Sequence, residues 1–146
     1  MTTVSNKTLE IQSNLEEVAI VGISSRAIAE SLSFSEGAAY EIELAVVEAV
    51  TNCIEHAYLY QSDKTVFIQF DVSNESLTIK VEDSGIYWRN FDEQTSKSSP
   101  FEFDPEDIEN LPEGGMGVSL LVSLMDEVKY ERKNNINTLT LKKHLK

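Results

Sequence analysis

The stretch SEGAAYEIELAVVEAVTNCIEHAYLY, residues 35–60, carries the most regular pattern in the chain. Its apolar residues recur every three or four positions, which places them on one face of a helix. These residues are Ile42, Ala45, Val46, Ala49, Val50, Cys53, Ile54 and Ala57. Ser35, at the start of the stretch, is a residue type that is favoured as the N-cap of a helix. The stretch therefore predicts a long helix whose buried stripe runs for about four turns.

The segments on either side of this helix predict further helices and strands. A strand is predicted at 7–12 and a helix at 15–32, capped by Asn14. Polar and apolar residues alternate in 65–72 and in 76–83, which predicts the two strands of a hairpin. A short apolar helix is predicted at 118–128. A second hairpin follows, with strands at 127–132 and 137–145. Adjacent strand pairs, with helices sufficient to cover one face, predict a two-layer α+β sandwich.

Composition limits the classes of function. The 146 residues fit one domain spanning 1–146, and 41% of them are hydrophobic. The net charge of -13 argues against nucleic-acid binding and against binding to an anionic membrane surface. No run of apolar residues is long enough to span a bilayer, and the N-terminus has no signal-peptide core. A single cysteine excludes an internal disulfide, so we expect a cytoplasmic protein.

Two polar residues of the long helix are candidates for chemistry. Glu48 and Asn52 are four positions apart and therefore neighbours at the edge of the apolar stripe. They supply a potential base and an oxygen ligand suited to Mg²⁺. Such a pair more often simply faces solvent at the edge of a helix and has no chemical role. His56 is expected at the rim of the stripe, and Cys53 as a buried structural thiol.

Two further motifs suit a nucleotide. Asp83 ends a predicted strand and Gly85 follows it, so the carboxylate could accept an amino group while the glycine admits a flat ring. Taken alone, this DSG is more often a simple turn. The segment EGGMG, residues 113–117, exposes successive backbone N–H groups at the start of a helix, which favours phosphate binding or else a flexible hinge.

Taken in order, three segments resemble one known superfamily. The segments EAVTNCIEHAY (48–58), VEDSG (81–85) and EGGMGVSLLVSLMDEV (113–128) resemble the N, G1 and G2 boxes of the GHKL ATP-binding proteins. The chain is most similar to the anti-sigma-factor serine kinases of bacterial partner-switching modules, from about residue 7 to residue 145. The resemblance implies the Bergerat fold, with a mixed, mostly antiparallel sheet and helices on one face.

The resemblance also implies roles for particular residues. Glu48 matches the catalytic glutamate, a general base, and Asn52 the Mg²⁺ ligand. Asp83 matches the aspartate that holds the adenine amino group, and Gly85 the glycine beneath the ring. Thr138 falls where the family places a threonine near the adenine.

The phosphate end of ATP is assigned in the same way. Gly115 and Gly117 match the phosphate-contacting glycines, with Gly114 beside them, and the segment of about 89–113 matches the ATP lid. Lys97 is a candidate contact for the γ-phosphate. Tyr87 stands where much of the superfamily has a second glycine, which favours the switch kinases over the gyrase branch.

The function implied is that of a slow, ATP- and Mg²⁺-dependent protein-serine/threonine kinase acting as an anti-sigma-factor-like switch. The resemblance implies a homodimer that phosphorylates a STAS-domain antagonist and sequesters a sigma factor or another output protein. One alternative is a non-catalytic ATP-binding module that only sequesters its partner. A second is a stand-alone histidine-kinase-type ATPase domain, whose accepting histidine would have to come from another chain.

Overall fold

The computed structural model describes residues 5–88, 91 and 115–145. Its elements follow the predicted order of strands and helices. They are β1 (Ser5–Gln12), α1 (Leu15–Ser31), α2 (Glu36–Asn52), the π-helical turn η1 (Cys53–Ala57), β2 (Thr65–Val72), β3 (Ser76–Asp83), α4 (Gly115–Leu124), β4 (Glu127–Lys133) and β5 (Ile136–His144).

The described strands form one sheet in the order β1-β2-β3-β5-β4. The two predicted hairpins are β2–β3 and β4–β5, and the second inserts its last strand beside β3. This insertion makes β5 antiparallel to both of its neighbours, and β1 is antiparallel to β2. The two-layer α+β sandwich is confirmed, but no parallel pair of the kind expected for a mixed sheet occurs among the described strands.

The helices begin where their caps predict. The side chain of Asn14 accepts a hydrogen bond from the backbone N–H of Glu16 (2.9 Å), and Ser35 Oγ accepts one from Ala38 (3.1 Å). The long predicted helix is α-helical only to Asn52 and continues as the π-turn η1. Such single π-turns are frequent at functional sites, because they change the direction of the side chains that follow.

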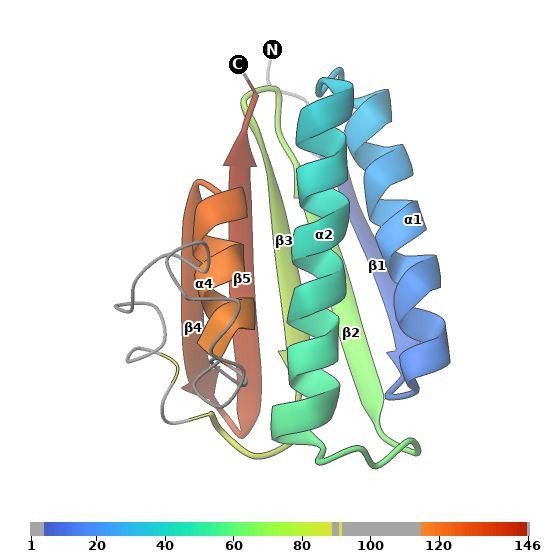
Figure 1. The fold of residues 1–146 in the computed structure, drawn as a ribbon, viewed down its shortest axis with the longest axis vertical. Coiled ribbons are helices and arrows are strands. Elements are labelled where there is room, and N and C mark those ends of the chain that lie inside the picture. The colour runs from blue at the N-terminus through green and yellow to red at the C-terminus, as the bar shows by residue number, and fades with distance from the viewer. Residues whose placement is uncertain (1–4, 89–90, 92–114, 146) are drawn as a thin grey trace, which may run out of the picture.

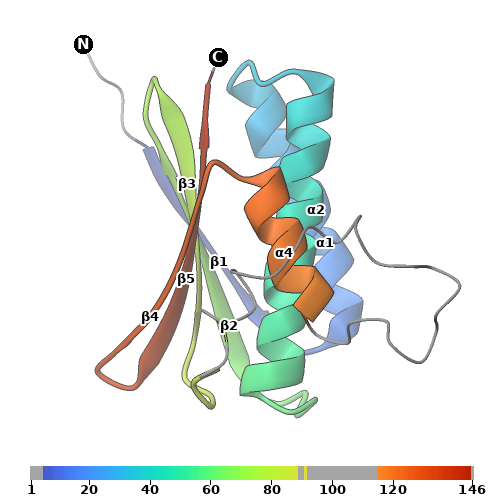
Figure 2. The same ribbon diagram turned by 60° about the vertical axis from the view of Figure 1, so that its left-hand side comes forward.

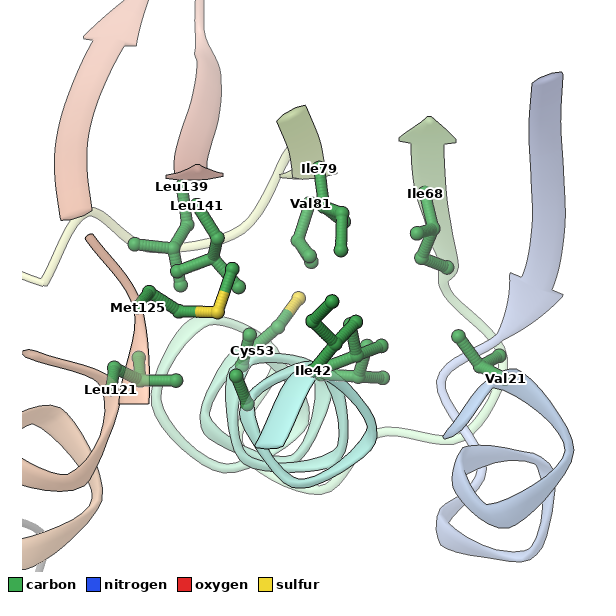
Figure 3. Packing of buried hydrophobic residues seen from close by; sticks show 14 of the residues in the cluster. Val21, Ile42, Cys53, Ile68, Ile79, Val81, Leu121, Met125, Leu139 and Leu141 are labelled. Atoms are coloured by element: carbon green, nitrogen blue, oxygen red, sulfur yellow. The ribbon is translucent and has the colours of Figure 1, made fainter. Parts of the chain in front are cut away.

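The three α-helices among the described residues, α1, α2 and α4, cover the same face of the sheet (Figure 2), and α2 lies between the other two (Figure 1). The core lies between these helices and the inner face of the sheet (Figure 3). Ile42 of α2 and Ile79 of β3 are fully buried, and each such side chain contributes about 1.5–3 kcal/mol to folding. Among the described residues, no helix is long and apolar enough to cross a membrane.

Alternation along β3 and β5 brings two polar residues to the inner face. Leu77, Ile79 and Val81 point into the core, and Asp83 is the next inward position of β3. On β5, Asn137 shares the inner face with Leu139 and Leu141, and the register pairs it directly with Asp83. The end of α2, the end of β3 and the start of β5 therefore meet at one end of the sandwich (Figure 1).

Candidate functional site

Asp83 is the central acceptor at this end of the molecule. It is 6% exposed, and its Oδ1 accepts hydrogen bonds from the backbone N–H of Gly85 (2.9 Å) and from Nδ2 of Asn137 (2.8 Å). Its Oδ2 accepts only the thiol of Cys53, at 3.3 Å, among the described residues. Burial raises the pKa of this carboxyl above its usual value, and the bond from Asn137 is the strongest of the influences that hold it down.

The turn after Asp83 is fixed against η1. A Cβ on Gly85 would lie 2.9 Å from the Cβ of Ala57 and closer still to the carbonyl oxygen of Ala57. That oxygen accepts a hydrogen bond from the backbone N–H of Ile86 (2.9 Å), and Tyr58 Oη accepts one from that of Ser84 (2.9 Å). The backbone of Ala57 alone therefore requires a glycine at position 85, whether or not a flat ring of a ligand also approaches there.

The polar pair of α2 lies beside this turn. Asn52 is 7% exposed, and its Nδ2 has no hydrogen-bond partner among the described residues. A buried amide without a partner costs roughly 1–3 kcal/mol, so its persistence points to a ligand. Glu48 lies one turn earlier and is half-buried. Burial raises the pKa of its carboxyl, and the nearby Glu55 carboxylate raises it further.

A pocket joins Asn52 to Asp83. It is lined by Ala49, Asn52, Cys53, His56, Ala57, Val81, Asp83, Trp88, Phe91, Tyr130 and Leu139. The open cavity is about 20 Å³, which suffices for about one water molecule. A purine base therefore enters only if the lining side chains move.

Aromatic rings from three segments, η1, β4 and the chain after β3, close the pocket. Trp88 stacks on His56 (centroids 4.1 Å apart, planes at 14°) and contacts Phe91 edge-on at 5.7 Å. Tyr130 lies beside Phe91 and stacks on Tyr87 at 5.1 Å, which gives the tyrosine at the second-glycine position a packing role. Burial raises the pKa of Tyr130 to about 12, and its Oη accepts a hydrogen bond from the backbone N–H of Trp88.

The outcome for Cys53 and His56 agrees with their expected places. Cys53 is buried, and burial together with Asp83 raises the pKa of its thiol, so it donates as a neutral group. His56 lines the pocket from η1, and its buried Nε2 lies 4.0 Å from Oε2 of Glu55 and has no hydrogen-bond partner among the described residues.

Thr138 is not brought to the pocket. The register pairs it with Glu82, and alternation places its side chain on the outer face of the sheet. The inner position belongs to Asn137, one residue earlier and fully buried. The role of Thr138 near an adenine stays a prediction, and the structure shows only that Thr138 does not line this pocket, because the pairing of β5 with β3 decides which face β5 buries.

The glycine-rich segment is described only in part. Gly115 and Gly117 lie in the first turn of α4. The last turn of α4 lies at the far end, where Leu124 accepts a hydrogen bond from Lys143, so the first turn faces the end that carries Asn52 and Asp83 (Figure 2). Gly114, Lys97 and most of the predicted lid at 89–113 lie outside the described residues.

Sequence reasoning missed Asn137, Arg132, Trp88 and Tyr130. Arg132 Nη1 donates to Oδ1 of Asn137 (2.9 Å) and to the carbonyl oxygen of Gly85 (3.0 Å). Of these four, only Asn137 had a signal in the sequence. Polar and apolar residues alternate along 138–141, and Asn137 falls on the same side of the strand as Leu139 and Leu141.

Known proteins resemble this chain in sequence and in fold. A family model for the histidine kinase-like ATPase domain matches residues 11–143. The serine-protein kinase RsbW of Listeria innocua is 31% identical over 145 residues, which are 97% of this chain and 90% of the relative. The RsbW kinase of Staphylococcus aureus is 36% identical, covering 75% of this chain and 70% of the relative. A chain in the crystal structure of the SiaB–SiaC complex from Pseudomonas aeruginosa has the same fold, with a TM-score of 0.64 at 8% identity and coverage of 95% and 89%.

The chain therefore belongs to the family of histidine kinase-like ATPase domains, as the three sequence boxes implied. Within that family it is a protein-serine kinase of the RsbW type, the class of partner-switching kinases.

Proposed function

We propose that this chain is a cytoplasmic switch kinase that transfers the γ-phosphate of ATP to a serine or threonine of a small STAS-domain antagonist. It binds a sigma factor or another output protein in alternation with that antagonist, and it acts as a homodimer. The proposal draws on the serine-protein kinase relatives, which match nearly the whole chain, and on the polar groups that converge on one pocket.

The observation that carries the proposal is that one pocket holds both a buried amide nitrogen without a hydrogen-bond partner among the described residues and a buried carboxylate oxygen with only a weak one. Among the residues that the structure describes, Nδ2 of Asn52 has no hydrogen-bond partner, and Oδ2 of Asp83 accepts only from the weak thiol donor of Cys53. Both residues line the same cavity, one from α2 and one from β3. A buried amide and a buried carboxylate in this state favour a ligand that offers both donors and acceptors, as a nucleotide does.

The residues present fit Mg-ATP. Asp83 would hold the adenine amino group, and the side-chain oxygen of Asn52 would be the protein ligand of Mg²⁺, which binds few protein oxygens besides phosphates. When bound, Mg²⁺ neutralises charge on the phosphates. The backbone N–H groups at Gly115 and Gly117, and at Gly114 before them, would bind the phosphates at the start of α4. Lys97 and the lid at 89–113 are proposed to cover the γ-phosphate.

Glu48 is the proposed general base. In the transfer, the hydroxyl oxygen of the substrate forms a bond to the γ-phosphorus while the bond from that phosphorus to the bridging oxygen of ADP breaks. The hydroxyl proton passes to the Glu48 carboxylate, and ADP leaves. The raised pKa of Glu48 suits this role, because a base with a higher pKa accepts a proton more readily.

Incubation of the purified chain with γ-labelled ATP, Mg²⁺ and candidate STAS-domain proteins tests the proposal. We expect label on a serine or threonine of one partner, and a loss of at least about a hundredfold in rate for Glu48→Ala. The matched control is Glu43→Gln on the same helix, whose carboxylate instead lies 3.5 Å from Arg26 of α1. ATP binding without transfer to any partner would support the sequestering module instead, and undiminished transfer by Glu48→Ala would refute the base assignment.

A further inference from the structure

Asn137 makes the most complete side-chain hydrogen-bond set near the pocket. It is fully buried in β5, and its Nδ2 donates to Oδ1 of Asp83 (2.8 Å) and to the carbonyl oxygens of Gly85 (3.1 Å) and Ile86 (3.3 Å). Its Oδ1 accepts from Nη1 of Arg132 (2.9 Å). One amide therefore joins β5, β4 and the turn that follows β3.

Arg132 fixes which way this amide points. Arginine only donates hydrogen bonds, so the amide oxygen must face Arg132 and the amide nitrogen must face Asp83. The reversed amide would place an oxygen against the Asp83 carboxylate and a nitrogen against the guanidinium, losing both bonds. Nη1 also donates to the carbonyl oxygen of Gly85, which ties the end of the β4–β5 hairpin to the same turn.

The consequence falls on the two oxygens of Asp83. Oδ1 is occupied by the N–H of Gly85 and by Asn137. Within the described part of the chain, Oδ2 accepts only from the Cys53 thiol, a weak donor, at 3.3 Å. The carboxylate is thus held by one oxygen, and the other is left as the acceptor in a pocket that both Asp83 and Cys53 line.

We infer that Asn137, oriented by Arg132, is a positioning residue that fixes the Asp83 carboxylate and thereby sets the selectivity of the pocket for bases that carry an exocyclic amino group. This inference rests on the proposed nucleotide site. An amino group donates to Oδ2, whereas the carbonyl oxygen of a 6-oxo purine in the same place is a second acceptor and forms no hydrogen bond with Oδ2. Sites built to bind a donor reject analogues without it for this reason.

Paired dissociation constants for ATP and inosine triphosphate test the inference, because the latter has an oxygen in place of the adenine amino group. We expect the wild-type chain to prefer ATP by at least about tenfold. Asn137→Ala frees the carboxylate to rotate, so this preference should fall by about tenfold, through loss of ATP affinity rather than gain of inosine triphosphate affinity. Thr140→Ala is the matched control, since Thr140 lies on the outer face of the same strand, and it should leave the ratio unchanged.

Arg132→Gln is a second variant for the case that Asn137→Ala fails to fold, because Arg132 is exposed. It should lower the same ratio in the same direction, and Arg132→Lys should restore part of it. If these residues had a structural role alone, the variants would bind both nucleotides more weakly by the same factor, and the ratio of the two dissociation constants would not change. That result would overturn the inference while leaving the proposed ATP site intact. A wild-type chain that binds neither nucleotide would refute the proposed function itself, and equal wild-type affinity for the two would refute the selectivity.

Discussion

The carbonyl oxygen of Ala57 occupies the space that a side chain on Gly85 would need. The turn after β3 is thereby packed directly on the π-turn at the end of α2, and the backbone N–H of Ile86 bonds to the same oxygen. This contact brings Asp83 and Asn52, which come from different layers of the sandwich, to one pocket.

Replacement of Gly85 should therefore damage both stability and the pocket. In Gly85→Ala the new methyl group meets backbone atoms that cannot rotate away, so we expect a loss of roughly 1–3 kcal/mol in the free energy of unfolding, measured with urea. ATP affinity should fall as well. Gly37→Ala is the matched control, because a Cβ there meets nothing within 4 Å and a helical Gly→Ala change stabilises by up to about 1 kcal/mol. A Gly85→Ala protein as stable as wild type would contradict the contact.

Removal of the unpartnered amide should stabilise the free protein while abolishing its function. Asn52→Leu keeps the branched shape and the number of side-chain heavy atoms, and it removes a buried amide nitrogen that has no hydrogen-bond partner among the described residues. We expect a gain of roughly 1 kcal/mol in the stability of the nucleotide-free chain. Thermal unfolding with and without Mg-ATP measures both effects, since wild type should be stabilised by nucleotide and the variant should not. A variant that is destabilised when free and still protected by Mg-ATP would contradict the role given to Asn52.

Activity should depend on pH through Glu48. Burial, followed by the Glu55 carboxylate, raises the pKa of Glu48, and a general base works only when it is deprotonated. The transfer rate should therefore rise with pH through this raised pKa. Glu55→Gln removes the neighbouring charge, so the rise should move to lower pH.

The pH profile of kcat/KM measures this shift, and Glu43→Gln should leave it unchanged. Glu43 lies on the same helix, but its carboxylate pairs with Arg26. A shift to higher pH in Glu55→Gln would have the wrong sign for the electrostatic account.

Nucleotide entry should be visible through Trp88, the single tryptophan of the chain. The cavity of about 20 Å³ cannot hold a purine, so the stack of Trp88 on His56 must open or shift. We expect a saturable change in tryptophan emission with the same dissociation constant as ATP binding. ATP bound with no change in emission would mean that the base enters elsewhere.

Much of this architecture could be predicted from local patterns. The caps at Asn14 and Ser35 and the hairpin strands at 65–72 and 76–83 depend on neighbours in sequence, and the structure has them at those residues. The α+β sandwich followed from their order, and Glu48 and Asn52 from helical spacing.

The remaining features depend on pairing between distant segments. Whether Asn137 or Thr138 faces the pocket is decided by the register of β5 against β3, and a shift of one residue exchanges the two faces. The Arg132 contact spans the two strands of a hairpin and a separate turn. The steric need for glycine at position 85 could not be predicted either. It depends on the position of Ala57, which is set by the π-turn η1.

Titration calorimetry of Mg-ATP into the wild-type chain and into Asp83→Ala tests the central claim most directly. The claim is that the pocket between Asn52 and Asp83 is the nucleotide site of this kinase. We predict one ATP per chain for wild type and an affinity at least about tenfold weaker for Asp83→Ala, with the Glu43→Gln control unchanged. Failure of the wild-type chain to bind ATP, or equal affinity in Asp83→Ala, would contradict it.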